Sequence, residues 1–242
     1  MFPLRDSVFC RTVPMVVLAI VAANAAVFLY ERSLDPLEMR EMLGKFALIP
    51  ARHFDWRWAV GMGFDPGDYT SFLTSMFLHG GWFHVILNLW TLWIFGCALE
   101  DRLGHVRFLV FYLLCGLAAA VVHVMLYSTS VIPVVGASGA IAGVISAYAV
   151  SYPTARLTVL VPLFCVIPLF IEIPAVFFAL FWFLMQIVQG SLQLYAPGLG
   201  GSVAWWAHLG GFFSGVILLW LMAPDRGDPG GRPPHPGAHD TA

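Results

Sequence analysis

Long apolar runs, separated by short polar stretches, follow one another along most of this chain. Six runs predict membrane-spanning helices, at residues 14–30, 79–98, 107–127, 138–152, 172–190 and 203–222. About 20 apolar residues in a helix that rises about 1.5 Å per residue cross the ~30 Å hydrocarbon layer of a bilayer. The fourth run is short for a span, and we expect it to extend at one end. The pattern therefore predicts an all-α polytopic membrane protein, a bundle of six transmembrane helices.

One apolar stretch, from Leu157 to Gln189, is too long for a single crossing. Three prolines interrupt it, and Glu172 in its middle is, in this interpretation, the only carboxylate inside any span. We interpret the extra apolar segment around 157–171 as a buried or interfacial stretch that leads into the fifth helix. The pattern leaves a seventh span open.

The basic residues predict the orientation of the chain. They precede the first span, lie between the second and third and between the fourth and fifth, and follow the sixth: Arg5, Arg11, Arg102, Arg107, Arg156, Arg226 and Arg232. Short loops rich in Lys and Arg stay in the cytoplasm, so both termini are predicted to be cytoplasmic.

The same features divide the chain into three regions. Residues 1–13 form a cytoplasmic N-terminus, and residues 14–222 form the membrane domain, with a long first loop at 31–72. Residues 223–242, rich in Pro, Gly and His, form a cytoplasmic tail that is predicted to be disordered.

Composition supports the membrane assignment and excludes other classes. Of 242 residues, 60% are hydrophobic and 11% are charged, whereas soluble domains carry about 25% charged residues. The lipid bilayer is thus the expected environment, and a net charge of −2 gives no reason to expect a nucleic-acid partner. The four cysteines are scattered without a CxxC pair, which indicates neither a disulfide framework nor a zinc knuckle.

Polar side chains gather at one depth of the predicted bundle. In the predicted orientation three spans run from outside to inside, and their polar residues lie near their starts: His79, His84, Asn88, Ser138 and His208. These side chains should share the outer leaflet. Ionisable residues within spans are costly to bury and therefore favour a functional interpretation.

Ser138 and His208 suit nucleophilic catalysis, with the imidazole as general base for the hydroxyl. Gly139-x-x-x-Gly143 and Gly211-x-x-x-Gly215 favour close packing of the two helices that carry them, although small residues alone more often mean packing only. With no carboxylate at the same depth, we expect a Ser-His dyad.

His84 and Asn88 are four residues apart and therefore lie on one face of their helix. With the Ser138 amide they would form an oxyanion hole, and a purely interhelical hydrogen-bonding role has equal weight from spacing alone. We interpret His79 as structural, fastening the first loop. Zinc held by His79, His84 and His208 is the competing chemistry, but there is no HExxH motif or nearby carboxylate, so no metal or cofactor is expected.

These motifs resemble the rhomboid intramembrane serine proteases over about residues 70 to 222. The resemblance rests on three segments: His79-Gly80-Gly81-Trp82-Phe83-His84-Val85-Ile86-Leu87-Asn88, Gly136-Ala137-Ser138-Gly139 and Ala207-His208-x-x-Gly211. It implies a six-helix fold, Ser138 as nucleophile and His208 as base, with His84, Asn88 and the Ser138 amide as oxyanion donors. It also implies cleavage of other proteins' transmembrane segments without a cofactor, in a bacterial plasma membrane.

The chain departs from the family pattern at two places. Many members carry a Tyr, stacked on the catalytic His, where this chain has Ala142. We expect Phe212 or an aromatic residue of the 172–190 span to hold the His208 ring instead. Trp56-Arg57 lies well upstream of the place where the family's Trp-Arg pair usually lies.

The sequence therefore predicts an intramembrane serine endopeptidase that acts on single-pass or other transmembrane substrates. We expect these to enter through a lateral gap between the 79–98 and 172–190 spans. Two alternatives are a catalytically silent rhomboid-like protein that binds membrane clients and a small transporter. Both dyad residues are present, which disfavours the first, and the polar residues lie at one level, which disfavours the second. Substrate identity and oligomeric state stay open.

Overall fold

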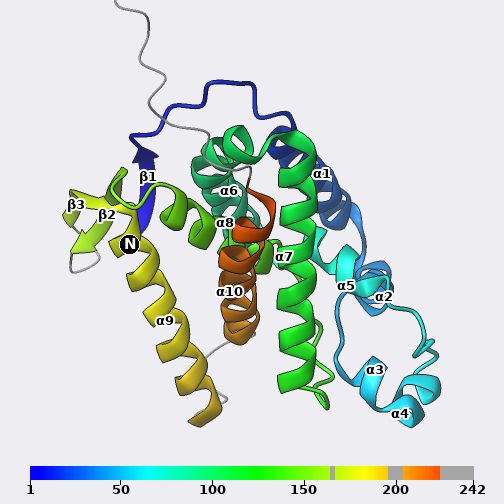
Figure 1. Ribbon diagram of the computed structural model, residues 1–242. Coiled ribbons are helices and arrows are strands. Elements are labelled where there is room, and N and C mark those ends of the chain that lie inside the picture. Colours follow the sequence, from blue (N-terminus) through cyan, green and yellow to red (C-terminus); the bar gives the residue numbers. More distant parts are fainter. Residues whose placement is uncertain (164–166, 196–203, 224–242) are drawn as a thin grey trace, which may run out of the picture.

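Six apolar helices form the body of the molecule (Figure 1). The computed structural model describes residues 1–163, 167–195 and 204–223. The six helices are α1 (Met15–Ser33), α6 (Trp82–Leu103), α7 (His105–Leu126), α8 (Ser138–Ser151), α9 (Ala175–Tyr195) and α10 (Trp205–Met222). Five of them are long and apolar enough to cross a membrane, and α8 is shorter, with 14 residues. The predicted helical membrane bundle is confirmed, although the fourth helix does not extend as expected.

Helix α8 lies at the centre, in contact with α6, α7, α9 and α10. Every residue from Ala140 to Ala149 is buried. A side-chain carbon added at Gly211 would collide with the carbonyl oxygen of Gly139, and one added at Gly215 would collide with that of Gly143. The close packing predicted from these glycines is confirmed, and it brings α10 directly against α8.

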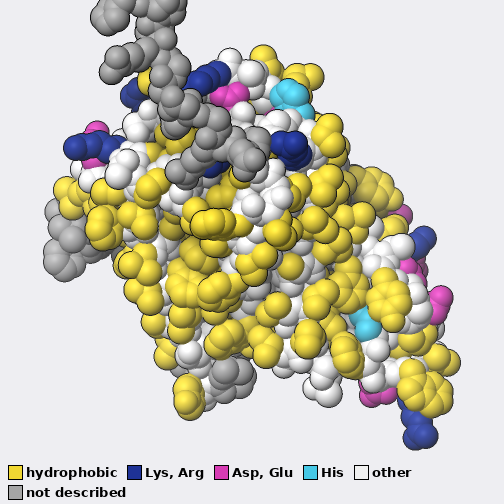
Figure 2. Space-filling view, in the orientation of Figure 1, with side chains coloured by type: hydrophobic (Ala, Val, Ile, Leu, Met, Phe, Trp, Pro, Cys, Tyr) yellow, Lys and Arg dark blue, Asp and Glu magenta, His cyan; other side chains and the backbone are white. Residues whose placement is uncertain are grey.

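Apolar side chains cover the middle of the molecule's visible face, over α7, α9 and α10 (Figure 2). Charged side chains gather near the junction of α6 and α7 and around the first loop. An exposed apolar belt between charged ends is the surface that a bilayer requires. The chain is a multi-pass membrane protein.

The first loop is folded into short helices. These are α2 (Pro36–Phe46), α3 (Ala51–Phe54), α4 (Trp56–Gly61), α5 (Ser71–Thr74) and the 3₁₀ turn η1 (Ser75–Phe77). The buried Arg52 guanidinium lies 2.7 Å from the Asp68 carboxylate and holds the loop together. Leu48 and Val134 exchange backbone hydrogen bonds of 3.0 and 2.8 Å. The loop therefore fixes the segment that leads into Ser138.

The apolar segment around 157–171 is neither a helix nor a seventh span. It forms the strands β2 (Arg156–Leu163) and β3 (Ile167–Pro174), which pair antiparallel with Pro162 opposite Pro168. Proline lacks the N–H that a helix interior needs, whereas β-branched and aromatic residues suit strands. Residues Phe2–Asp6 add β1 to the free edge of β2, so the fold is not wholly α-helical.

The interpretation of Glu172 is wrong in two respects. It lies on β3, where its exposed carboxylate is 3.5 Å from Arg156, and it is not the only carboxylate in a membrane element. Because α1 and α6 extend further than predicted, they include the buried Glu31 and Glu100. Glu31 accepts the backbone N–H of His79.

The start of the chain is fastened to the end of α6. Cys10 and Cys97 lie together, with their Cα atoms 5.9 Å apart, a contact for which the scattered cysteines gave no signal because 87 residues separate them. Asp101 accepts the backbone N–H groups of Arg11 and Thr12, and Glu100 accepts those of Val16 and Val17. Glu100 thus satisfies two N–H groups that the first turn of α1 leaves free, and Asp101 holds the segment that precedes this helix. Most of the predicted tail, 224–242, lies outside the described residues.

Candidate active site

Ser138 is the first residue of α8, directly after a tight backbone turn. Gly136 has a φ of +125°, a region that favours glycine, and its N–H donates to the Ser75 carbonyl at 2.9 Å. A side-chain carbon at Gly136 would lie 2.7 Å from the His84 ring. The turn therefore needs glycine for its conformation and for the approach of His84. The Ser138 amide belongs to the first helical turn, where N–H groups have no partner within the helix.

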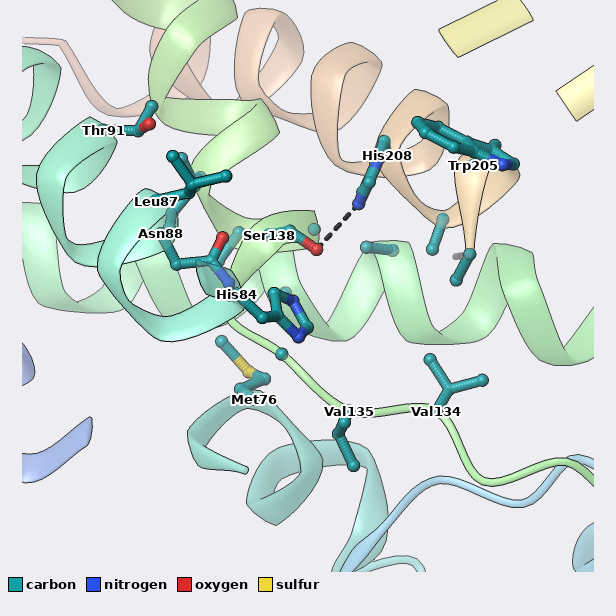
Figure 3. Close-up of a pocket in the computed structure, with 18 of the residues that line it drawn as sticks. Met76, His84, Leu87, Asn88, Thr91, Val134, Val135, Ser138, Trp205 and His208 are labelled. Carbon is teal, nitrogen blue, oxygen red and sulfur yellow. Dashed lines mark hydrogen bonds between the residues drawn. The ribbon is translucent and has the colours of Figure 1, made fainter. Parts of the chain in front are cut away.

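Ser138 and His208, 70 residues apart in the sequence, meet in a hydrogen bond. Ser138 Oγ lies 2.7 Å from His208 Nε2 (Figure 3). His208 lies in the first turn of α10 and is buried. The close contact between α8 and α10 brings the two together, in the arrangement of a nucleophile and its base.

The other ring nitrogen of His208 has a partner that the sequence analysis missed. Gln186 on α9 places its side-chain oxygen 2.7 Å from Nδ1, and its side-chain nitrogen donates to the Trp182 carbonyl at 3.2 Å. Gln186 is buried. The sequence does contain one indication of this role. Gln186 is the only polar residue between Ala175 and Val188, and polar side chains inside spans favour a functional interpretation.

Aromatic rings from other positions pack around His208, because this chain has Ala142 at the position where a tyrosine could stack on the imidazole. The Trp182 ring lies 5.8 Å from the imidazole, centroid to centroid, at 38°, and the Trp205 ring meets it edge-on at 6.0 Å. Phe212 stacks on Trp182 at 6.2 Å. The ring is therefore held by an aromatic residue of the fifth span, one of the expected candidates, and Phe212 supports that residue.

His84 and Asn88 both point toward Ser138 from α6 (Figure 3). The side-chain nitrogen of Asn88 is buried and has no hydrogen-bond partner among the described residues. Such an unpaired donor costs about 1–3 kcal/mol, which makes it notable beside a serine hydroxyl. His79 packs edge-on against His84 at 5.1 Å.

A cavity of about 700 Å³ joins these side chains. Ser138, His208, His84 and Asn88 all line it. The zinc alternative needed three converging imidazoles. In the described part of the chain, no three His, Cys, Asp or Glu side chains are grouped to hold a metal ion.

One wall of this cavity comes from the start of the chain. Met1, Phe2 and Pro3, at the head of β1, line it. The Trp90 indole on α6 donates to the Pro3 carbonyl at 2.7 Å, and the Phe2 ring stacks on Trp90 at 6.1 Å. The sequence predicted only a cytoplasmic segment at 1–13 and gave no sign of this strand.

Comparison with known proteins assigns most of the chain. The family described as Rhomboid domain matches residues 66–225, which include every candidate site residue. One similar protein is the Arabidopsis thaliana RHOMBOID-like protein 6, mitochondrial, which is 28% identical over 81% of this chain and 57% of its own length. Another, from the same organism, is Rhomboid-like protein 11, chloroplastic, which is 30% identical over 63% of this chain and 52% of its own length. Rhomboid protein 1, mitochondrial, of Saccharomyces cerevisiae is 27% identical over 63% of this chain and 42% of its own length. The chain thus spans about half the length of these relatives.

Proposed function

Because this chain belongs to the rhomboid family, we propose that it is an intramembrane serine endopeptidase that hydrolyses peptide bonds in or near transmembrane segments of other membrane proteins. The observation that carries the proposal is the 2.7 Å contact between Ser138 Oγ and His208 Nε2. The contact lies in a cavity that is lined in large part by helices of the membrane bundle.

In the proposed reaction, His208 Nε2 takes the hydroxyl proton as Ser138 Oγ attacks the scissile carbonyl carbon. The carbonyl oxygen becomes an oxyanion that accepts hydrogen bonds from the Ser138 amide and the Asn88 amide, with His84 as a third donor. His208 then gives its proton to the leaving amine, and water hydrolyses the acyl-enzyme by the same route. The unpaired Asn88 nitrogen supports this role, since preorganised donors are the main source of oxyanion stabilisation.

The substrate has to present an extended backbone to Ser138. Carbonyl groups inside a helix are already hydrogen-bonded, so helix-breaking residues near the cut site should favour cleavage. We place the lateral route of the substrate between α6 and α9. Strand β1 contacts α6, and its neighbour β2 contacts α9, so the sheet lies along this route.

We also propose that both termini are cytoplasmic, on the basis of the arginine distribution. The expectation of a bacterial plasma membrane has no support from the reported relatives, two of which are named mitochondrial and one chloroplastic. Accessibility of cysteines introduced on either side of the membrane would test the orientation.

The test of activity uses the purified protein, a substrate with one transmembrane helix and a fluorophosphonate probe. We expect cleavage and labelling by the wild type, and neither by Ser138→Ala; His208→Ala should also abolish cleavage. Thermal melting checks that each variant is folded. Equal cleavage or labelling by wild type and Ser138→Ala would refute the proposal. Binding of the substrate without cleavage by both forms would favour the silent client-binding protein.

A further inference from the structure

We propose that Gln186 is a positioning residue for His208: its side-chain oxygen keeps the ring proton on Nδ1, so that Nε2 is free to take the proton of Ser138. This inference rests on the proposed protease function. The family motifs quoted above do not include Gln186, and no carboxylate occupies its place.

The neighbours of Gln186 fix which way its amide faces. Its nitrogen donates to the Trp182 carbonyl one turn earlier on α9, at 3.2 Å, and this leaves the oxygen facing His208 Nδ1 at 2.7 Å. The reversed amide would set its oxygen against a carbonyl oxygen, and both are acceptors. The Trp182 carbonyl therefore determines the orientation of the Gln186 amide.

This orientation determines the tautomer of His208. A neutral imidazole has one N–H and one acceptor nitrogen, and a partner that only accepts requires the N–H on its side. The other tautomer would bring two acceptors together at 2.7 Å, between side chains that are only 5% and 7% exposed. The other tautomer would therefore lose this hydrogen bond and place two acceptors in repulsion.

Helix α9 also limits rotation of the imidazole. The Trp182 ring, four residues before Gln186, packs against the His208 ring at 5.8 Å. A single helix thus supplies both the hydrogen-bond acceptor and an aromatic contact. Since Gln186 is neutral, it orients the base without the charge stabilisation that a carboxylate would add to the protonated ring.

The experiment compares Gln186→Leu, Gln186→Glu and the matched control Gln189→Leu, an exposed glutamine of the same helix. In Gln186→Leu we expect kcat to fall about 10²-fold with KM unchanged, less than the ~10⁴-fold loss known for a wrongly held tautomer in a serine triad. Gln189→Leu should match the wild type. Nitrogen-15 NMR of histidine-labelled protein, with His208→Ala for assignment, should show the proton on Nδ1 in the wild type and its loss from Nδ1 in Gln186→Leu.

Gln186→Glu should restore part of kcat at alkaline pH, because a carboxylate also accepts the Nδ1 proton, whereas its second oxygen cannot donate to the Trp182 carbonyl. It should also move the acidic limb of the pH–rate profile to higher pH, since a negative charge favours the imidazolium, which cannot act as a base. The other titratable side chains that interact electrostatically with His208 are His84 on α6 and His123 on α7. All variants keep both, so the shift is due to residue 186.

A wild-type kcat or an unchanged tautomer in Gln186→Leu would overturn the role of Gln186. If that variant fails to fold, an unmoved acidic limb in Gln186→Glu overturns it. Equal cleavage by wild type and Ser138→Ala refutes the protease function instead, and the tautomer measurement still decides whether Gln186 sets the ring proton.

Discussion

Replacing Asn88 by Leu should make the protein more stable and a slower enzyme. The two side chains are similar in size, but leucine has no polar group to bury. In the resting structure the Asn88 amide nitrogen is buried and has no partner among the described residues. Removing an unsatisfied donor recovers about 1–3 kcal/mol of folding free energy. Losing one oxyanion donor raises the barrier by about 2.7–4 kcal/mol, a 10²–10³-fold fall in kcat.

The assay pairs kcat on a transmembrane substrate with the midpoint of thermal unfolding. Asn24→Leu is the matched control for kcat, because Asn24 is another buried asparagine, on α1; its side chain donates to the Ile20 carbonyl at 2.7 Å, and its oxygen has no partner among the described residues. The control should lose that bond and leave kcat unchanged. If Asn88→Leu keeps kcat within about twofold, under 0.5 kcal/mol of barrier, the oxyanion role is wrong. A fall in both quantities would show instead that the amide supports the fold.

Three further substitutions test the framework of the site. Gly136→Ala should displace the His84 ring and lower kcat about 10²-fold, as a misplacement near 1 Å can, in a protein that still melts cooperatively. Gly211→Val should push α10 away from α8 and lower the free energy of unfolding by about 1–3 kcal/mol or more. Thermal melting of the Ser138→Ala protein, which should stay folded, provides the reference. Glu100→Leu should cost about 1.5–3 kcal/mol, because two N–H groups of α1 lose a charged acceptor; an unchanged melting curve would contradict this.

The sequence predicted the helices well because lipid imposes a simple requirement on them. A span must be apolar for about 20 residues, and the hydropathy of the sequence detects such a run directly. The segment around 157–171 is equally apolar, so hydropathy could not distinguish strands from a helix there. Its pairing with β1 joins segments about 150 residues apart in the sequence, and no local pattern reports such a partner.

The candidate site likewise contains residues that the sequence predicted and one, Gln186, that it did not. Ser138, His208, His84 and Asn88 lie within recognisable motifs, and the shared depth of their spans indicated that they would meet. Gln186 lies outside those motifs, and its role depends on how α9 is rotated about its own axis relative to α10. That rotation follows from the packing of Trp182 and Phe212, which becomes visible only when the helices are assembled.

The position of β1 affects how the protein should be prepared. Met1 lines the cavity that holds Ser138. Two residues after Met1, the Pro3 carbonyl accepts a hydrogen bond from the Trp90 indole. An affinity tag joined ahead of Met1 would start at the cavity wall and would have to dislodge the strand or obstruct the space beside it. A tag that is joined elsewhere and does not contact β1 leaves the strand in position. Activity measured with the tag at each end in turn would separate the behaviour of the protein from that of its tag.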